Sequence, residues 1–445
     1  MKKLLKGARV LDPARGLDGV MDVLIEGGKI SAVDKEVTAG DAEVVDLTGL
    51  VLVPGLVDMH VHFRDPGFQY KEDIESGSRS AAAGGFTTVA CMPNTNPPVD
   101  NAALVSYVIS KAERVGLVRV LPVGCVSKGR QGREMAEIGD MAAAGAVAFS
   151  DDGKPVADSS LMRRALLYAS MFDRVVIDHC EEPALSEGGV MNEGYISTVL
   201  GLPGTPRSAE ETAVARDIIL AGETGARVHI AHVSTRGSVE LIRRAKAEGV
   251  RVSCEVTPHH LVLTEEVVMG YDTCAKVNPP LRTEEDVEAL IEGLKDGTID
   301  AIATDHAPHS EDEKDLEFDR AAFGISGLET ALGLVLTCLV TPGKLSLSEA
   351  VRKMTREPAG ILGVEAGTLK PGSSADITVI DPDREWTVNK YDFLSKGKNT
   401  PFHGWKLKGK AVMTFTGGKM VFKDAAWERD RKARIVYKTG GSPRP

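Results

Sequence analysis

Two histidines, His60 and His62, stand two residues apart at the end of an apolar run that begins at Leu56. In a β-strand, residues i and i+2 point to the same face, so both imidazoles can bind one metal ion. Arg64 follows two residues later, and its planar guanidinium can bind an anion through two parallel hydrogen bonds. A His-x-His pattern alone is weak evidence for a metal site, so the other ligands must come from elsewhere in the chain.

Further histidines and aspartates follow other apolar runs, at the points where these runs end. They are Asp151-Asp152, Asp178-His179, His232 and Asp305-His306, with His309 close behind. Imidazole nitrogens and carboxylate oxygens are the ligands that a hydrolytic divalent metal site needs. Four histidines and two acids suffice for two ions, with one acid bridging them. Such a pair would bind one water molecule, lower its pKa and polarise a carbonyl oxygen.

Each of these candidates also has a structural interpretation. Asp151 and Asp152 can form a turn before Gly153, and Asp305 can cap a helix. An isolated histidine near the end of a strand more often hydrogen-bonds the backbone than binds a metal. Coincidence explains a single residue well but explains the whole set poorly, because all of its members stand at the ends of such runs. We therefore favour the metal site.

Three other histidines and the cysteines receive different interpretations. His229 lies three residues before His232, so the two face opposite sides of a strand, and we expect His229 to be structural. For His259 and His260, which follow Pro258, a structural role, support of a ligand and a role as ligand stay open. The six cysteines form no Cys-x-x-Cys pattern, which indicates buried thiols in a reducing, cytoplasmic setting.

The elements that must position these residues are eight short apolar runs, separated by stretches long enough for crossover helices. The runs are 57–62, 87–92, 119–125, 146–150, 174–179, 227–232, 251–256 and 299–304. One intervening helix is predicted by Thr283 and Asp286, which form a capping box, and another by Ser208 with Glu211. This alternation is typical of an α/β protein with a (β/α)8 TIM-like barrel, whose active site lies at the carboxyl ends of the strands.

The two ends of the chain predict a second, smaller unit. A Gly-Gly-Lys turn between apolar stretches occurs at Gly27–Lys29 and again at Gly417–Lys419. We expect both termini to pair into one small flanking β-sandwich domain. The expected division is residues 1–54 and 367–445 for this domain and 55–366 for the barrel.

The composition restricts the classes of partner. The 445 residues are 42% apolar and carry a formal net charge of −11, which disfavours a nucleic-acid partner or an acidic membrane surface. No run approaches the roughly 20 apolar residues that span a bilayer, and the start of the chain does not read as a signal peptide. A local cationic pocket remains compatible with an anionic small-molecule substrate.

Several of these motifs resemble a known family. His60–Gly67 and Ala303–His309 are similar to the two signatures of the dihydroorotases in the amidohydrolase superfamily. Cys91–Thr95, Ser150–Gly153 and Val277–Arg282 extend the resemblance over nearly the whole chain. The resemblance is to the longer, class I form, and it implies a metal-dependent hydrolase barrel flanked by a β domain.

The resemblance implies a metal role for each candidate ligand. The ligands are His60, His62 and Asp305 for one zinc ion, His179 and His232 for a second, and Asp152 as the bridge between them. Two ions per subunit are expected, with a single ion as the alternative. Many superfamily members bridge their metals with a carbamylated lysine, but Asp-Asp stands at this position here. Lys154, two residues past Asp152, is a poor substitute.

The resemblance also implies how the substrate is bound. The substrate-binding residues would be His62, Arg64, Asn94, Asn278, His309, Phe323 and Gly324. Arg64, assisted by Asn94 and His309, would hold the substrate carboxylate, whereas Asn278 and the backbone of residues 323–324 would contact the ring amides. Asp305 would be the catalytic residue that transfers the proton.

The activity implied is reversible, zinc-dependent cyclisation of N-carbamoyl-L-aspartate to (S)-dihydroorotate in de novo pyrimidine biosynthesis. A homodimer and an association with aspartate carbamoyltransferase are also implied. Two alternatives stay open: another cyclic amidohydrolase (hydantoinase, dihydropyrimidinase or allantoinase) and a non-catalytic partner subunit. Arg64 disfavours the first because dihydropyrimidine substrates carry no ring carboxylate, and the complete set of ligands disfavours the second.

Overall fold

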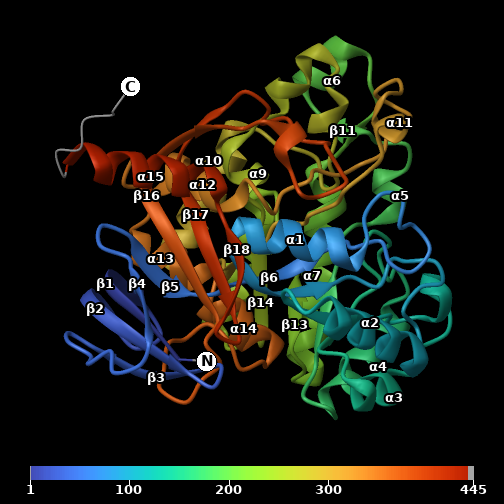
Figure 1. Ribbon diagram of the computed structural model, residues 1–445. Coiled ribbons are helices and arrows are strands. Elements are labelled where there is room, and N and C mark those ends of the chain that lie inside the picture. The colour runs from blue at the N-terminus through green and yellow to red at the C-terminus, as the bar shows by residue number, and fades with distance from the viewer. Residues whose placement is uncertain (1, 439–445) are drawn as a thin grey trace.

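Parallel strands form a barrel in the middle of the molecule (Figure 1). The computed structural model describes residues 2–438, and within this range eight barrel strands neighbour one another in chain order. They are β6 (Leu56–Val61), β7 (Phe86–Cys91), β8 (Arg119–Gly124), β9 (Ala148–Phe149), β10 (Val175–Asp178), β13 (Val228–Ile230), β14 (Val252–Val256) and β15 (Ala301–Ile302). The barrel closes where Val61 pairs with His306 and the His62 amide donates to the His306 carbonyl (2.9 Å). The predicted (β/α)8 barrel is confirmed, and every predicted run overlaps its strand; β6 and β7 begin one residue before the predicted runs.

Helices connect the strands and cover the outside of the barrel (Figure 1). The longer ones are α1 (Ile74–Gly84), α2 (Ala102–Val115), α3 (Ile138–Ala144), α4 (Ser159–Ser170), α7 (Arg207–Thr224), α8 (Arg236–Ala247), α10 (Glu284–Asp296), α13 (Leu347–Lys353) and α14 (Arg356–Leu362). The capping box of α10 is confirmed, with Thr283 and Asp286 bonded reciprocally. The predicted cap at Ser208 is wrong, because α7 already begins at Arg207, after Pro206. Proline lacks an amide hydrogen and has a fixed φ, which suits the start of a helix.

The remaining elements lie in the connections and at the end of the described residues, and all of them except α15 are short. They are η1 (Lys128–Arg130), α5 (Pro183–Ser186), β11 (Met191–Asn192), α6 (Tyr195–Leu200), β12 (Gly204–Thr205), α9 (Pro258–Val262), η2 (Glu265–Gly270), η3 (Thr273–Ala275), α11 (Glu311–Lys314), α12 (Ala331–Val335), η4 (Leu336–Val340), η5 (Lys390–Asp392) and α15 (Ala425–Lys438). Across residues 2–438, no helix has the length and apolarity that crossing a bilayer requires.

A second sheet, built from both ends of the chain, flanks the barrel, as predicted (Figure 1). Its strands are β1 (Lys2–Asp12), β2 (Leu17–Glu26), β3 (Lys29–Asp34), β4 (Glu43–Asp46), β5 (Val51–Pro54), β16 (Ile377–Thr387), β17 (Lys406–Thr416) and β18 (Lys419–Lys423). All of them belong to one hydrogen-bonded sheet, in which β5 pairs antiparallel with β16 and so joins the two ends. The exact domain boundaries near residues 54 and 367 stay a prediction.

The two Gly-Gly turns noted in the sequence touch each other in this sheet. Gly27, Gly28, Gly417 and Gly418 all have positive φ, between 55° and 82°. A Cβ atom added at Gly28 would lie 2.9 Å from the Gly417 carbonyl oxygen, whereas one added at Gly27 would meet no atom within 4 Å. Glycine is therefore required at residue 28 both for its backbone conformation and for the close approach of the second turn.

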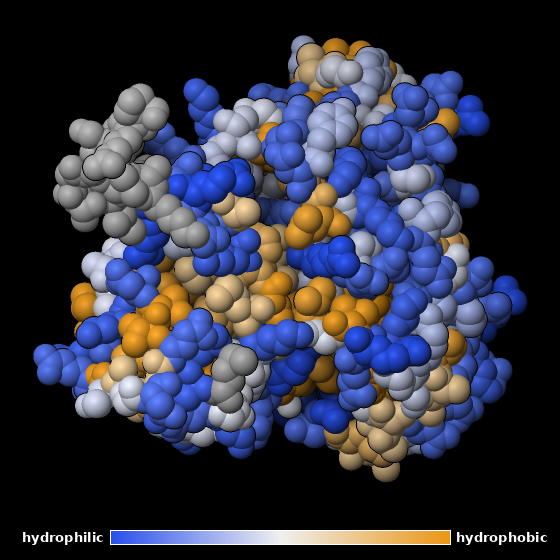
Figure 2. Space-filling view, in the orientation of Figure 1, coloured by the Kyte–Doolittle hydropathy of each residue, from blue (hydrophilic) through white to orange (hydrophobic). Residues whose placement is uncertain are grey.

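The flanking sheet is tied to the barrel through α1. Thr414 on β17 donates to the Ala82 carbonyl (2.7 Å), and Thr378 on β16 donates to the carbonyl of Gly85, which ends α1. Figure 2 shows apolar side chains among polar ones in the middle of this face. A groove there is lined by residues of α1, α2 and β18, including Val421 and Phe422. The barrel and the sheet are thus held together by direct hydrogen bonds as well as by apolar packing.

We predict that Gly28→Ala lowers the free energy of unfolding by about 2–3 kcal/mol, because it combines left-handed backbone strain with a steric clash. Gly27→Ala is the matched control and should cost only about 1–2 kcal/mol, since it introduces the strain without the clash. Urea denaturation of both variants measures the difference. Equal destabilisation would contradict the role assigned to the contact between the turns.

Candidate metal centre and active site

The candidate ligands gather at the carboxyl ends of the barrel strands. His60 is on β6, His62 follows it directly, and the other ligands lie within three residues of the ends of β9, β10, β13 and β15. All of them are buried. A cavity of about 270 Å³ opens between them, and its lining residues are His62, Arg64, Asn94, Asp152, Gly153, His179, His232, Asn278, Asp305, Ala307, His309, Phe323 and Gly324. Every residue that the sequence assigned to metal or substrate therefore lines this cavity, except His60, which lies beneath it.

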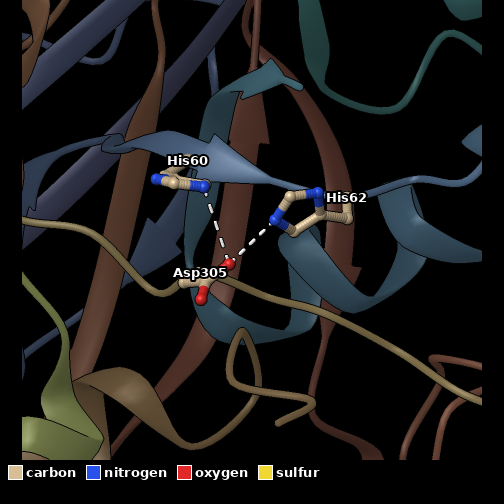
Figure 3. A group of neighbouring side chains, drawn as sticks. All are labelled: His60, His62 and Asp305. Atoms are coloured by element: carbon tan, nitrogen blue, oxygen red, sulfur yellow. Dashed lines mark hydrogen bonds and ion pairs between the residues drawn. The ribbon is translucent and has the colours of Figure 1, made fainter. Parts of the chain in front are cut away.

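One group of candidate ligands consists of His60, His62 and Asp305. Figure 3 shows the two imidazoles turned toward the carboxylate of Asp305. His62 Nε2 lies 2.8 Å from Asp305 Oδ1, and His60 Nε2 lies 3.6 Å from the same oxygen. The prediction that His60 and His62 point to the same face is confirmed, because both rings face the inside of the barrel.

Asp152 lies between this group and the other two histidines. Its Oδ1 is 3.3 Å from His60 Nε2, 3.6 Å from His232 Nε2 and 3.9 Å from His179 Nδ1. Its Oδ2 is 3.5 Å from His62 Nε2. The carboxylate thus reaches both pairs of histidines, which is the arrangement that a bridging ligand needs. Lys154, in contrast, is exposed.

The residues present fit a divalent metal. Two ligand atoms that are each about 2.0–2.1 Å from one tetrahedral ion lie about 3.3 Å apart, close to the separations around Asp152. Among the described residues, His60 Nε2 and Asp152 Oδ1 are buried without any hydrogen-bond partner. Buried polar atoms are normally paired, so both atoms call for a ligand that the protein chain does not supply.

The backbone is strained at three residues of this site. Arg64, His232 and Asp305 have φ values of 58°, 31° and 46°, in the left-handed region that residues with a side chain seldom adopt. Such strain costs of order 1–3 kcal/mol per residue and persists only where the surrounding structure imposes it. The strained residues are two candidate ligands and the candidate anion-binding residue. This indicates that the direction of these side chains is kept at a cost in backbone stability.

The electrostatics of the cluster favour a cation. Burial alone raises the pKa of Asp305, but the positive charge of His60 and a hydrogen bond with His62 lower it below its ordinary range. Burial also opposes the charge of His60, whereas Asp152, Glu255 and Asp305 raise the pKa of its ring. These carboxylates create a negative field in a dry environment, and a metal ion that binds there would displace the proton from His60.

Glu255 on β14 is a functional residue that the sequence analysis missed. Its Oε1 lies 2.6 Å from His60 Nδ1, the ring nitrogen opposite the candidate metal, and its Oε2 lies 3.3 Å from His229 Nε2. Burial opposes the ionised carboxylate, but His60 and His229 lower the pKa of Glu255 to about 2. A carboxylate behind a histidine ligand orients the ring and makes it a better donor. An acid inside a strand carries no motif, so only the three-dimensional contact identifies it.

The structure indicates roles for two of the three remaining histidines. His229 holds Glu255 and contacts Ser253 Oγ (2.9 Å), in line with the expected structural role. His260 contacts Thr257 Oγ1 (2.7 Å) and the Pro279 carbonyl (3.0 Å), so it is structural as well. His259 is buried, and its Nε2 has no hydrogen-bond partner among the described residues.

Glu181, a second missed residue, supports the opposite side of the site. Its Oε2 lies 3.3 Å from His179 Nε2 and accepts a hydrogen bond from Asn278 Nδ2 (2.7 Å). Burial works against its charge, but His179 and its other partners lower the pKa of Glu181 to about 2. Glu181 therefore fixes both a candidate ligand and a candidate substrate contact. Its place two residues after His179 is the only sign of this in the sequence.

The far end of the cavity carries an unpaired positive charge. Among the described residues, no carboxylate forms an ion pair with Arg64. Its Nε donates to the Pro308 carbonyl (3.3 Å), and one terminal nitrogen lies 3.3 Å from His309 Nε2. Burial, Arg64 and Lys71 together lower the pKa of His309 to about 3, so this ring is neutral at physiological pH. The guanidinium is thus available for an anionic ligand.

The last two predicted substrate contacts lie on one short segment. The Gly324 amide already donates to the Lys276 carbonyl (2.9 Å), and the Gly324 carbonyl accepts from Asn399 Nδ2 (2.9 Å). The ring of Phe323 lies over Lys276 Nζ at 4.3 Å and is 38% exposed. What this segment can offer a ligand is the Phe323 backbone and the second lone pair of the Gly324 carbonyl.

We predict that Glu255→Gln weakens metal binding about 10–100-fold, the usual effect of losing a carboxylate behind a histidine ligand. The glutamine amide can hold the ring, but it lacks the charge that makes His60 a stronger donor. Competition with a chromogenic chelator, performed on the purified protein, measures the affinity.

Glu265→Gln is the matched control for this prediction. Glu265 is also buried, but it bonds Asn192 (2.7 Å) and none of the candidate ligands. Its substitution should leave chelator sensitivity unchanged. If Glu255→Gln resembled this control, Glu255 would have no part in metal binding.

Comparison with known proteins agrees with the metal-dependent hydrolase site that the geometry indicates. Residues 49–238 match the family model described as "Dihydro-orotase-like", and residues 212–422 match that of the amidohydrolase family. The chain is 59% identical over 424 residues to the dihydroorotase of Pelotomaculum thermopropionicum and 56% identical over 421 residues to that of Acetivibrio thermocellus. Each alignment covers 95% of this chain and 99% of the relative.

Solved structures with the same fold include hydantoinases and dihydropyrimidinases. The L-hydantoinase (dihydropyrimidinase) from Arthrobacter aurescens superposes with a TM-score of 0.85 at 28% identity, over 95% of this chain and 96% of that one. The dihydropyrimidinase from Brevibacillus agri gives 0.81 at 24% identity, over 95% of each chain, and supports the fold alone. With full-length relatives at this level of identity, the chain belongs to the dihydroorotase family of metal-dependent amidohydrolases.

Proposed function

We propose that this chain catalyses the reversible cyclisation of N-carbamoyl-L-aspartate to (S)-dihydroorotate in pyrimidine biosynthesis. The observation that carries the proposal is the guanidinium of Arg64, without a carboxylate partner in the described part of the chain, in the same cavity as the cluster of histidines and aspartates. A substrate with a carboxylate at one end and a cyclic amide at the other fits these two chemistries. The names of the full-length relatives support the same activity.

The metal proposed is zinc, with two ions per chain. His60, His62 and Asp305 would hold one ion, His179 and His232 the other, and Asp152 would bridge them. The nitrogen and oxygen donors and their separations suit zinc. When bound, the metals would supply Lewis acidity and lower the pKa of a water molecule.

Asp305 is the proposed proton carrier of the reaction. In the hydrolytic direction it takes the proton of the attacking water and passes it to the ring nitrogen that leaves. In the biosynthetic direction it removes a proton from the carbamoyl nitrogen, which attacks the carboxyl carbon as water is lost. Its lowered pKa, the net result of burial opposed by His60 and His62, keeps Asp305 in the basic form at neutral pH. His62 positions it through the 2.8 Å contact with Oδ1.

Arg64, Asn94 and His309 are proposed to bind the substrate carboxylate. His309 is neutral: its Nδ1 lies 3.1 Å from Glu313 Oε2 and its Nε2 faces a terminal nitrogen of Arg64, so it assists by placing the guanidinium. Asn94 Oδ1 lies 2.8 Å from His62 Nδ1, which places its amide between the metal end and the anion end. Asn278 and the Phe323–Gly324 backbone are proposed to contact the ring amides.

The alternative cyclic amidohydrolases are less well supported. A hydantoin or dihydrouracil ring carries no carboxylate for Arg64, so the half-buried guanidinium would gain no charged partner from such a substrate. Lys154 is exposed, so Asp152 rather than a modified lysine is the proposed bridge. A non-catalytic partner subunit is disfavoured because the metal ligands and the anion site are complete.

We also infer a cytoplasmic location, because the six cysteines are all free thiols, as in proteins of a reducing compartment. A homodimer and an association with aspartate carbamoyltransferase stay predictions of the family resemblance. Light scattering of the purified chain, alone and mixed with that enzyme, tests both.

We predict that the zinc-loaded protein interconverts N-carbamoyl-L-aspartate and dihydroorotate, and that Arg64→Gln lowers kcat/KM about 30-fold or more. The loss reflects a charged hydrogen-bond partner removed from the substrate carboxylate. Arg79→Gln, which removes an exposed guanidinium on α1, is the control and should have no effect. Faster turnover of dihydrouracil or hydantoin than of dihydroorotate would refute the assignment.

We predict about two zinc ions per chain by elemental analysis, and about one or fewer in Asp152→Asn, because an amide is a poor bridging ligand. Asp151→Asn is the control: the neighbouring carboxylate accepts from the amides of Val126 and Ser127 and should leave the metal content unchanged. One zinc ion in the wild-type protein would support the single-metal alternative.

A further inference from the structure

A segment from outside the barrel reaches the candidate active site. After β16 the chain leaves the flanking sheet, and residues 393–399, here called the strap, lie against the barrel before β17 begins. Two carboxylates, the buried Glu72 and the half-buried Glu329, accept hydrogen bonds from the strap. Glu329 Oε1 accepts from the amides of Leu394 (2.8 Å) and Ser395 (3.1 Å), while Glu72 accepts from the Ser395 hydroxyl and the Lys396 amide. The strap is therefore anchored to the barrel along its length.

Asn399, at the end of the strap, forms four hydrogen bonds at once. Its Nδ2 donates to the carbonyls of Ala307 and Gly324 (2.9 Å each). Its Oδ1 accepts from the His309 amide (3.0 Å) and from Ser326 Oγ (2.8 Å). A side-chain amide has two donor hydrogens and two acceptor lone pairs, so all of them are used. The side chain is 3% exposed, and its partners leave only one orientation of the amide.

These partners belong to both substrate subsites. Ala307–His309 leads to the anion end, where the Pro308 carbonyl accepts from Arg64 and His309 lies beside the same guanidinium. Gly324 and the preceding Phe323 form the proposed ring-amide subsite. The two segments already pair through the Ala307 amide and the Ile325 carbonyl (2.9 Å). Beyond that pair, the carbonyls of Ala307 and Gly324 both turn to Asn399.

We propose that Asn399 is a positioning residue that sets the distance between the carboxylate subsite and the ring-amide subsite. It does not line the cavity, so it acts only through His309 and Gly324. The carbonyls of Ala307 and Gly324 each need a hydrogen-bond donor. The side-chain NH2 of Asn399 supplies both donors, while its oxygen accepts from the His309 backbone amide. The inference rests on the proposed function, because it assumes that these subsites bind dihydroorotate. The inference gives a role in substrate selection to the strap, which lies in the sequence between two strands of the flanking sheet.

Asn399→Asp is the sharpest test, since it keeps the shape and replaces two donors with an acceptor that faces two carbonyl oxygens. We expect KM for dihydroorotate to rise about ten-fold or more, with kcat within about three-fold and an unchanged zinc content. The dissociation constant of orotate, which carries the same carboxylate on a related ring, should weaken by a similar factor. Asn389→Asp is the matched control: Asn389 uses only its oxygen, as the cap of η5, and aspartate retains that acceptor.

A second variant covers the case in which Asn399→Asp does not fold. Asn399→Ser keeps a hydroxyl that can serve only part of the network, so it should raise KM by a smaller factor. An unchanged KM in either folded variant would overturn the inference, as would a lowered kcat that follows loss of zinc, because these results indicate a purely structural role. A wild-type protein that does not turn over dihydroorotate would refute the proposed function itself, which the same assay reveals separately.

Discussion

Buried negative charge at the mouth of the barrel is the constraint on which the rest of the structure depends. Asp152, Asp305 and Glu255 are carboxylates within a few ångströms of His60, all shielded from water. Isolated charges in such an environment are very unfavourable unless they are paired or bind a metal. The histidines, the atoms left without partners and the strained backbone at Asp305 all serve an arrangement that a divalent cation completes.

The cavity is polarised, and the proposed selection of substrate depends on this polarity. Acidic residues and imidazoles occupy one end, and the other holds the guanidinium of Arg64, which forms no ion pair with a carboxylate of residues 2–438. A ligand with a carboxylate and a cyclic amide can satisfy both ends only in one orientation. The neutral imidazole of His309 contacts the same guanidinium through Nε2 and helps to place it without adding charge. Hydantoinases share this fold, and under the proposed function the charge at this second end would distinguish the site from theirs.

Much of this could be predicted from the chain itself, for local reasons. The spacing of His60 and His62 on an apolar run defines their common face, and the apolar runs define the barrel strands. Thr283 and Asp286 cap their helix through neighbours three residues apart. Where the prediction was wrong, at the start of α7, the local signal was read at Ser208 although Pro206 already allows the helix to begin.

The sequence by itself determined the strands and singled out the candidate ligands and the candidate anion-binding arginine, because each depends on residue identity and on short spacings. Only the tertiary structure decided which carboxylates stand behind the ligands and how the two subsites are held apart. Glu255 lies 195 residues from His60, and Asn399 lies 90 residues from His309. Such contacts leave no periodic or motif signal, since they arise only when the barrel closes and the strap from the flanking sheet packs against it.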